Sequence, residues 1–288
     1  CSKRMLSFVL RMASLRDRIT SVVTRAFPWA WRLAVIALPW QTRWFQEGPQ
    51  IAGYPWEEGR ISIYASQLLM LVVVLTHAFL RRSEDKTSRI EKKQSHLPLL
   101  LIAAFFFVSA FTTASLRATA EWWIEVSILV LFVRVLIQRV AWRELSFWFV
   151  LSLLPHTLLG ITQAFTQQVF GTSFLGIASQ NPAIRGVAVI ESNGIRWLRS
   201  YGGFPHPNIF GGWLVMGIVC VFTSLKHHFS LKRERVFYYI TLVLFSIALA
   251  VTYSRSAWLA LGMFVGLTLL SLVFSKKDTQ KRLLMLLL

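Results

Sequence analysis

The chain has 288 residues, of which 55% are hydrophobic and 15% charged, and its mean hydropathy of +0.54 excludes an ordinary soluble domain. The formal net charge of +18 would suit a nucleic-acid partner, but the basic residues form short clusters between apolar segments. We therefore expect an all-α, polytopic integral membrane protein whose partner is the lipid bilayer and not nucleic acid.

The ends of the sequence set the domain boundaries that we expect. The chain begins with Cys-Ser rather than Met, and residues 283–288 look like the start of a further, truncated span. We therefore interpret the sequence as the front part of a longer protein. Residues 1–26 are predicted to form a basic segment in the cytoplasm or on the membrane surface. Residues 27–282 are predicted to form the transmembrane helical domain.

About eight transmembrane helices are predicted, because eight apolar segments alternate with polar or basic connections. The segments are 27–40, 61–80, 97–116, 122–137, 145–166, 209–225, 236–252 and 257–274. Residues 40–60 are expected to form an exposed loop, and the longest polar connection covers about 167–208.

The distribution of arginine and lysine predicts the orientation. With a cytoplasmic N-terminus, 24 of the 31 basic residues lie on the cytoplasmic side. Cytoplasmic loops of membrane proteins carry such an excess. The loop 167–208 and the turn 253–256 then lie on the extracytoplasmic side, where no ATP is available.

The segment 196–213 is the candidate functional site, because it is polar, rich in Gly and Pro, and placed just before an apolar run. It contains Arg196, Arg199, His206 and Asn208. We expect its glycines to let the backbone approach a ligand closely.

Arg255 interrupts an otherwise apolar hairpin, and two interpretations are open. Its side chain either reaches to the membrane interface or binds an anion, since a guanidinium matches phosphate oxygens bidentately. Arg199 stands just before the chain re-enters the bilayer and favours the second interpretation. The two arginines together suit a lipid diphosphate at the membrane surface.

His206 and Asn208 each have two interpretations as well. Prolines on both sides stiffen the backbone of His206, which positions the imidazole for acid–base work or for a hydrogen bond to a sugar. The alternative is a solvated loop histidine. Asn208 either contacts substrate or caps the following helix.

Two boxes resemble the O-antigen ligase and polymerase family of bacterial membrane proteins. The first is Arg199-Ser-Tyr-Gly-Gly-Phe-Pro-His-Pro-Asn208, and the second is Thr252-Tyr-Ser-Arg255-Ser-Ala-Trp-Leu-Ala. The resemblance implies a multi-pass protein of the bacterial inner membrane with a role in lipopolysaccharide or other polysaccharide biosynthesis. It implies a metal-independent glycosyltransferase without cofactors.

By the same resemblance, the substrate is a glycan on undecaprenyl diphosphate, and the acceptor is lipid A core, another glycan or a protein. Arg199 and Arg255 would hold the diphosphate, and Arg196, His206, Asn208 and Ser254 join them as candidate substrate-binding residues. His206 is also a candidate catalytic residue, although the family implies a base beyond residue 288.

Three further points bound this function. Nothing in the residues distinguishes ligase from polymerase. The outer side carries no Asp-x-Asp pair and Cys1 and Cys220 match no metal spacing, which argues against a metal-dependent nucleotide-sugar transferase. A transporter or flippase for a lipid-linked glycan is the alternative from another class, and it would be expected to show internal repeats and charges at mid-membrane.

Overall fold

The computed structural model describes residues 2–46, 50–51, 54–55, 61–83, 97–112, 116–226 and 232–273. These residues contain eight helices and three two-stranded antiparallel sheets. The chain divides into two compact units, one made of Cys1–Leu38 and Thr42–Leu145 and the other of Pro39–Gln41 and Ser146–Leu288. The start of a further span expected at 283–288 lies outside the described residues.

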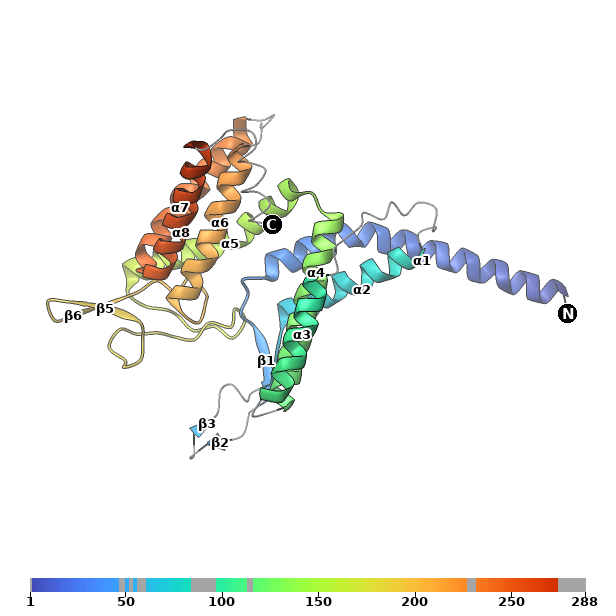
Figure 1. The fold of residues 1–288 in the computed structure, drawn as a ribbon, viewed down its shortest axis with the longest axis horizontal. Helices are drawn as coiled ribbons and strands as arrows, with labels where there is room; N and C mark the ends of the chain where they lie inside the picture. The colour runs from blue at the N-terminus through green and yellow to red at the C-terminus, as the bar shows by residue number, and fades with distance from the viewer. Residues whose placement is uncertain are drawn as a thin grey trace. The chain divides into compact units, whose positions relative to one another are not determined.

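Four helices belong to the first unit, and they are α1 (Ser2–Ala37), α2 (Ala65–Ser83), α3 (Leu97–Thr112) and α4 (Leu116–Arg139). α2 packs against both α1 and α4 (Figure 1). Trp31 and Val35 of α1, Val73 of α2 and Phe132 of α4 are buried. Apolar side chains therefore hold this unit together.

Strands of the first unit occupy part of the connection between α1 and α2. β1 (Arg43–Gln46) pairs with β4 (Ile61–Tyr64), and β2 (Gln50–Ile51) pairs with β3 (Tyr54–Pro55). The Ser62 main-chain N–H of β4 donates to the Glu121 carboxylate of α4.

The helices of this unit differ from the predicted spans in two places. The lead-in before residue 27 and the span 27–40 form one continuous helix, α1, which passes through Pro28. The span expected at 61–80 begins only at Ala65, because the preceding Ile-Ser-Ile-Tyr forms β4 instead. Alternation of apolar and polar residues over four positions favours a strand.

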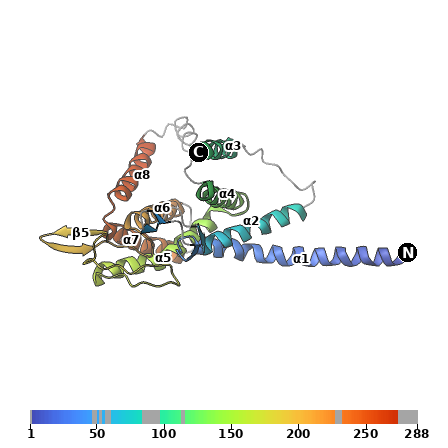
Figure 2. The same ribbon diagram turned by 90° about the horizontal axis from the view of Figure 1, so that it is seen from below.

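The second unit contains most of α5 (Trp142–Thr166) and all of α6 (Pro207–Lys226), α7 (Lys232–Thr252) and α8 (Arg255–Val273). α6 packs against both α7 and α8. Between α5 and α6, the chain forms a hairpin of β5 (Val189–Ser192) and β6 (Ile195–Leu198). The hairpin extends from the end of this helical group in both ribbon views (Figures 1 and 2).

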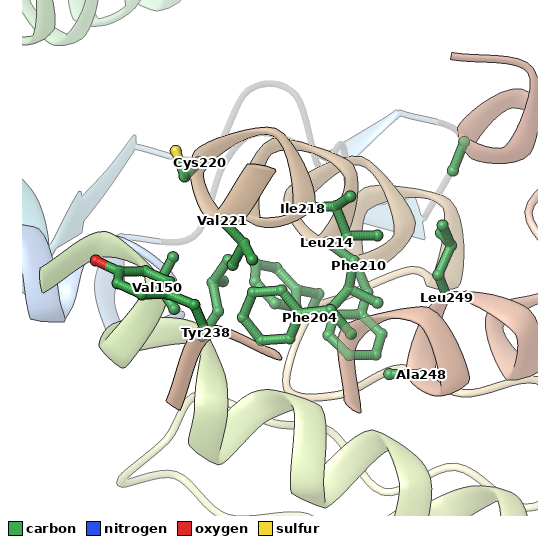
Figure 3. Packing of buried hydrophobic residues seen from close by; sticks show 13 residues of the cluster. Val150, Phe204, Phe210, Leu214, Ile218, Cys220, Val221, Tyr238, Ala248 and Leu249 are labelled. Atoms are coloured by element: carbon green, nitrogen blue, oxygen red, sulfur yellow. The ribbon is translucent and has the colours of Figure 1, made fainter. Parts of the chain in front are cut away.

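The core of the second unit combines all four helices with the loop before α6 (Figure 3). The rings of Phe204 and Phe210 stack with their centroids 5.5 Å apart. A buried contact between the Ser146 and Ser224 hydroxyls, 3.0 Å long, joins α5 to α6. The core residues are Val150, Leu153, Phe204, Phe210, Leu214, Ile218, Cys220, Val221, Tyr238, Phe245, Ala248, Leu249 and Ala257.

Four of the described helices, α2, α5, α6 and α7, are long and apolar enough to cross a membrane, and residues 255–271 of α8 form a shorter apolar helix. Of the predicted all-α protein with about eight spans, the structure confirms a mostly helical chain with four described helices that could span a membrane. Helices also occupy the expected spans 97–116 and 122–137, but α3 has only 16 residues and α4 carries several charged side chains.

Candidate functional site

The turn between α7 and α8 fixes the position of Arg255. Tyr253 adopts a positive φ of 49°, which reverses the chain directly after α7. Ser254 is fully buried and caps α8, since its carbonyl oxygen accepts from the Trp258 N–H at 3.0 Å and its hydroxyl lies 3.4 Å from the Ala257 nitrogen. Arg255 therefore starts α8, and its side chain is exposed.

The main chain around Arg199 is attached to this turn, although 53 residues separate Arg199 from Thr252. The Ser200 N–H donates to the Val251 carbonyl at 3.1 Å, and the Arg199 N–H donates to the Ala188 carbonyl at 3.2 Å. On the other side, the Ser200 hydroxyl donates to the Gly160 carbonyl of α5 at 2.6 Å. The end of β6 is thus held between α5 and α7.

The Arg199 side chain is fixed by neutral acceptors. Its Nε donates to the Thr252 carbonyl oxygen at 2.8 Å, and its Nη2 donates to Asn208 Oδ1 at 2.6 Å. Within the part of the chain that the structure describes, no carboxylate forms an ion pair with Arg199 or Arg255. A guanidinium has five N–H donors, so Arg199 keeps hydrogen atoms for an anion.

The charge of Arg255 acts on Arg199. Burial lowers the pKa of Arg199, Tyr201 acts in the opposite direction, and repulsion from Arg255 lowers that pKa further. Arginine nevertheless remains charged at neutral pH. Two interacting positive charges without a described carboxylate partner favour the binding of an anion.

His206 lies near Arg199 and caps α6. Its carbonyl oxygen accepts from the Ile209 and Phe210 N–H groups, and its Nδ1 accepts from the Asn208 N–H at 3.1 Å. Burial and the charge of Arg199 both lower the pKa of His206. The ring is therefore neutral at pH 7, with its proton on Nε2 and available for donation.

The structure answers one open question about Asn208. The helix α6 starts at Pro207, so the capping position belongs to His206, and the interpretation of Asn208 as the cap was wrong. Asn208 instead orients Arg199 through its side-chain oxygen. A substrate contact for Asn208 stays a prediction.

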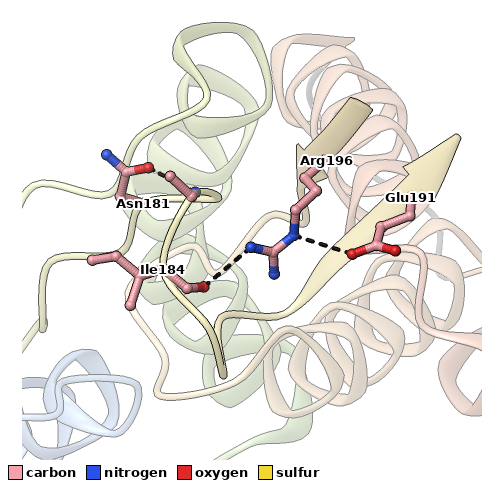
Figure 4. Close-up of polar contacts among 5 residues, drawn as sticks. Asn181, Ile184, Glu191 and Arg196 are labelled. Carbon is pink, nitrogen blue, oxygen red and sulfur yellow. Dashed lines mark hydrogen bonds and ion pairs between the residues drawn. The ribbon is translucent and has the colours of Figure 1, made fainter. Parts of the chain in front are cut away.

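Arg196 lies on β6, and its side chain contacts Glu191 of β5 and Ile184 of the preceding loop (Figure 4). Its Nε lies 3.1 Å from a Glu191 carboxylate oxygen, and its Nη1 donates to the Ile184 carbonyl at 3.5 Å. Arg196 thus differs from Arg199 and Arg255, because a carboxylate already balances its charge. Ser254 also differs from Arg199 and Arg255, because its side chain is fully buried in the turn between α7 and α8.

The glycines of the first box allow close packing of protein side chains, whereas we expected them to admit a ligand to the backbone. Gly202 and Gly203 have positive φ values of 68° and 151°, which side-chain-bearing residues rarely adopt. A Cβ at Gly202 would lie 2.6 Å from the Phe210 ring, and one at Gly203 would collide with His156 Nδ1. Protein side chains therefore fill the space that we expected a ligand to approach.

Gln163 of α5 supports the same loop and was missed by the sequence analysis. It is almost completely buried, and its Oε1 accepts from the main-chain N–H groups of Tyr201 at 3.0 Å and Gly202 at 2.9 Å. Nothing near Gln163 in the sequence indicates this role, since both partners lie nearly forty positions away.

Among the described residues, no group of three or more His, Cys, Asp or Glu side chains is arranged to hold a metal ion. Neither a protein-family model, nor a curated protein, nor a solved structure matches the chain. The interpretation of the site therefore depends on its geometry and on the two sequence boxes.

Proposed function

We propose that this chain is an O-antigen ligase-like membrane glycosyltransferase. It would transfer a glycan from undecaprenyl diphosphate to an acceptor lipid, glycan or protein. The observation that carries the proposal is the attachment of Arg199 to Thr252, because it brings Arg199 to the turn that is followed directly by a second arginine, Arg255. The two sequence boxes that resemble the family are the segments that meet there.

The chemistry of the cationic pair suits a diphosphate. Guanidinium groups bind phosphate oxygens through paired hydrogen bonds and keep their charge at any physiological pH. The neutral acceptors on Arg199 orient the guanidinium without cancelling its charge. A lipid diphosphate carries its negative charge at the membrane surface. In a protein anchored in the membrane by α7, the end of α7 and the start of α8 would lie at this surface.

The proposed reaction is a displacement at the anomeric carbon of the lipid-linked sugar. An acceptor hydroxyl oxygen forms the new bond to that carbon, and the bond from the carbon to the diphosphate oxygen breaks. The electron pair stays on the diphosphate, while the hydroxyl proton goes to a base. Arg199 and Arg255 would stabilise the charge that grows on the leaving group, and such electrostatic stabilisation is usually the largest catalytic contribution.

We propose further that the protein resides in the bacterial inner membrane with a cytoplasmic N-terminus. The excess of basic residues on one side of the predicted spans supports this orientation. The site then faces the extracytoplasmic side, where a lipid-linked donor needs no ATP for transfer because the diphosphate is already a good leaving group.

The experiment uses the protein in liposomes supplied with a lipid-linked donor and an acceptor. We expect the Arg255→Ala variant to lose transfer and Arg255→Lys to recover only part of it, because lysine lacks the planar fork. Arg185→Ala is the control, since Arg185 is an exposed arginine in the connection between α5 and α6 and lies outside the turn that carries Arg255. Undiminished transfer by both Arg255 variants would remove Arg255 from the mechanism.

The same liposomes distinguish a transferase from a flippase and a ligase from a polymerase. Movement of the donor between leaflets without any new glycosidic bond would assign the protein to transport and refute the transferase proposal. When lipid acceptor and glycan acceptor are offered together, the product identifies the acceptor class.

A further inference from the structure

The β5–β6 hairpin has one apolar face and one charged face. Its register pairs Ile190 with Trp197 and Glu191 with Arg196. Directly paired residues of antiparallel strands share a face, and successive residues alternate between faces. Ile190, Ile195 and Trp197 therefore lie together on one face, which we call the apolar face, and the Glu191–Arg196 pair lies on the other.

On β6, the exposed side chains are those of the apolar face. On β5, Ile190 is half-buried and Glu191 is exposed. Ile195 and Trp197 are 56% and 49% exposed, whereas Leu198 of the opposite face is only 3% exposed. The opposite face also holds the ion pair, and Arg196 donates from there to the Ile184 carbonyl of the same loop (Figure 4). A hairpin surrounded by water would normally turn its apolar side toward the protein.

The hairpin ends beside the C-terminal end of α7, a helix long and apolar enough to cross a membrane. Leu198, the last residue of β6, precedes Ser200, whose N–H bonds to the Val251 carbonyl in the final turn of α7. The hairpin extends sideways from the ends of α6 and α7 instead of continuing along their axes, as both ribbon views show (Figures 1 and 2). A segment with this direction runs roughly along the membrane surface.

We infer that the apolar face of the hairpin rests in the headgroup region of the bilayer that α5, α6 and α7 cross. Tryptophan is enriched at this level because its ring is apolar and its N–H is polar. Phe165, in the last turn of α5, is a further exposed aromatic residue of this unit, at 83%. By the charge distribution, the contact is with the extracytoplasmic leaflet.

The contact is shallow. A two-stranded hairpin has two edges with unpaired main-chain groups, and such groups are not tolerated in the hydrocarbon core. The headgroup region supplies water and polar lipid atoms for these edges while it accepts the side chains of Ile195 and Trp197. Arg199 follows β6 directly, so the hairpin would hold this arginine at the depth of lipid phosphates. The inference concerns lipid contact and does not depend on glycan transfer.

Nitroxide labels in the full-length protein, reconstituted in liposomes, test this contact. The natural cysteines are replaced by alanine, and labels are placed at Ile195→Cys and Trp197→Cys on the apolar face and at Glu191→Cys on the charged face as the matched control. We expect the ratio of oxygen to aqueous nickel-chelate accessibility to be several-fold higher at 195 and 197 than at 191, because oxygen partitions into the bilayer and the chelate does not.

Three outcomes would overturn the inference. Equal nickel-chelate accessibility at 191, 195 and 197 would place the hairpin in water. Spin–spin broadening at 195 with low accessibility to both reagents would mean that a second copy covers the apolar face. Accessibility to nickel chelate that disappears only when a glycan is added would identify this face as a saccharide contact.

Discussion

The Arg199 guanidinium donates from Nε to the Thr252 carbonyl oxygen at 2.8 Å, which links two sequence boxes across 53 positions. Because Nη2 simultaneously donates to Asn208, the guanidinium is held in one orientation. We expect Arg199→Lys to lower kcat/KM for transfer, because an ammonium group cannot reach both acceptors and an anion in the same geometry. A charge-assisted hydrogen bond contributes about 1.5–3 kcal/mol, so the decrease should be roughly 10- to 100-fold.

The control for this prediction is Arg185→Lys, which makes the same chemical change at an exposed position of the same loop. Expression level and melting temperature are measured alongside the transfer rates. If Arg199→Lys transferred glycan at the natural rate, the orientation of the guanidinium would have no part in catalysis.

Gln163 carries the second prediction. Replacing it by Leu removes the acceptor for the Tyr201 and Gly202 N–H groups while it keeps a side chain of similar size. Each buried N–H left without a partner costs about 1–3 kcal/mol, so we expect a lower melting temperature and faster amide hydrogen exchange at residues 201 and 202. Thr162→Val is the control, because Thr162 is the neighbouring position on α5 and is not buried. Unchanged exchange at both amides would show that Gln163 does not support the loop.

Apolar runs predicted the helices of the second unit closely. The end of α7 at Thr252 agrees with the prediction, and α6 and α8 each begin two residues earlier than expected. These helix boundaries could be predicted from the sequence because Pro, Ser and basic residues interrupt the apolar runs near the helix ends. In the first unit, β4 was missed since its four residues join the apolar run of α2 without a break.

The candidate site was predictable only in part. Arg199 and Arg255 stood out because arginine is costly beside apolar segments. The contacts that fix their surroundings depend on residues far apart in the sequence, such as Thr252 beside Arg199 or Gln163 beneath Tyr201. Tertiary hydrogen bonds of this kind leave no local periodicity, so a single sequence does not reveal them.

The third prediction concerns pH and His206. Burial and Arg199 lower its pKa in the folded protein below the ordinary value near 6.5 of the unfolded chain. In the window between these two values the unfolded state binds more protons, so folding stability falls with decreasing pH. The contribution of His206 is complete above about pH 6.5 and is lost as the pH falls through the folded-state pKa.

Thermal unfolding from pH 7.5 to pH 5 measures this effect. We expect His206→Asn to reduce the loss of melting temperature at acidic pH, because asparagine is a good helix cap and does not titrate. An identical pH dependence in the natural protein and in this variant would exclude His206 as the source.

Two adjacent glycines of α6 allow a matched test of the packing that places the Arg255 turn. A Cβ at Gly211 would lie 2.9 Å from the Ala257 Cβ and 3.0 Å from the Ser254 Cβ, whereas a Cβ at Gly212 would meet nothing within 4 Å. We expect Gly211→Ala to destabilise the protein by about 1–3 kcal/mol through overpacking against α8. Gly212→Ala should be neutral or slightly stabilising, because alanine favours the helix. Melting temperatures of the two variants in the same detergent provide the comparison, and equal values would show that α6 and α8 do not approach each other closely at Gly211.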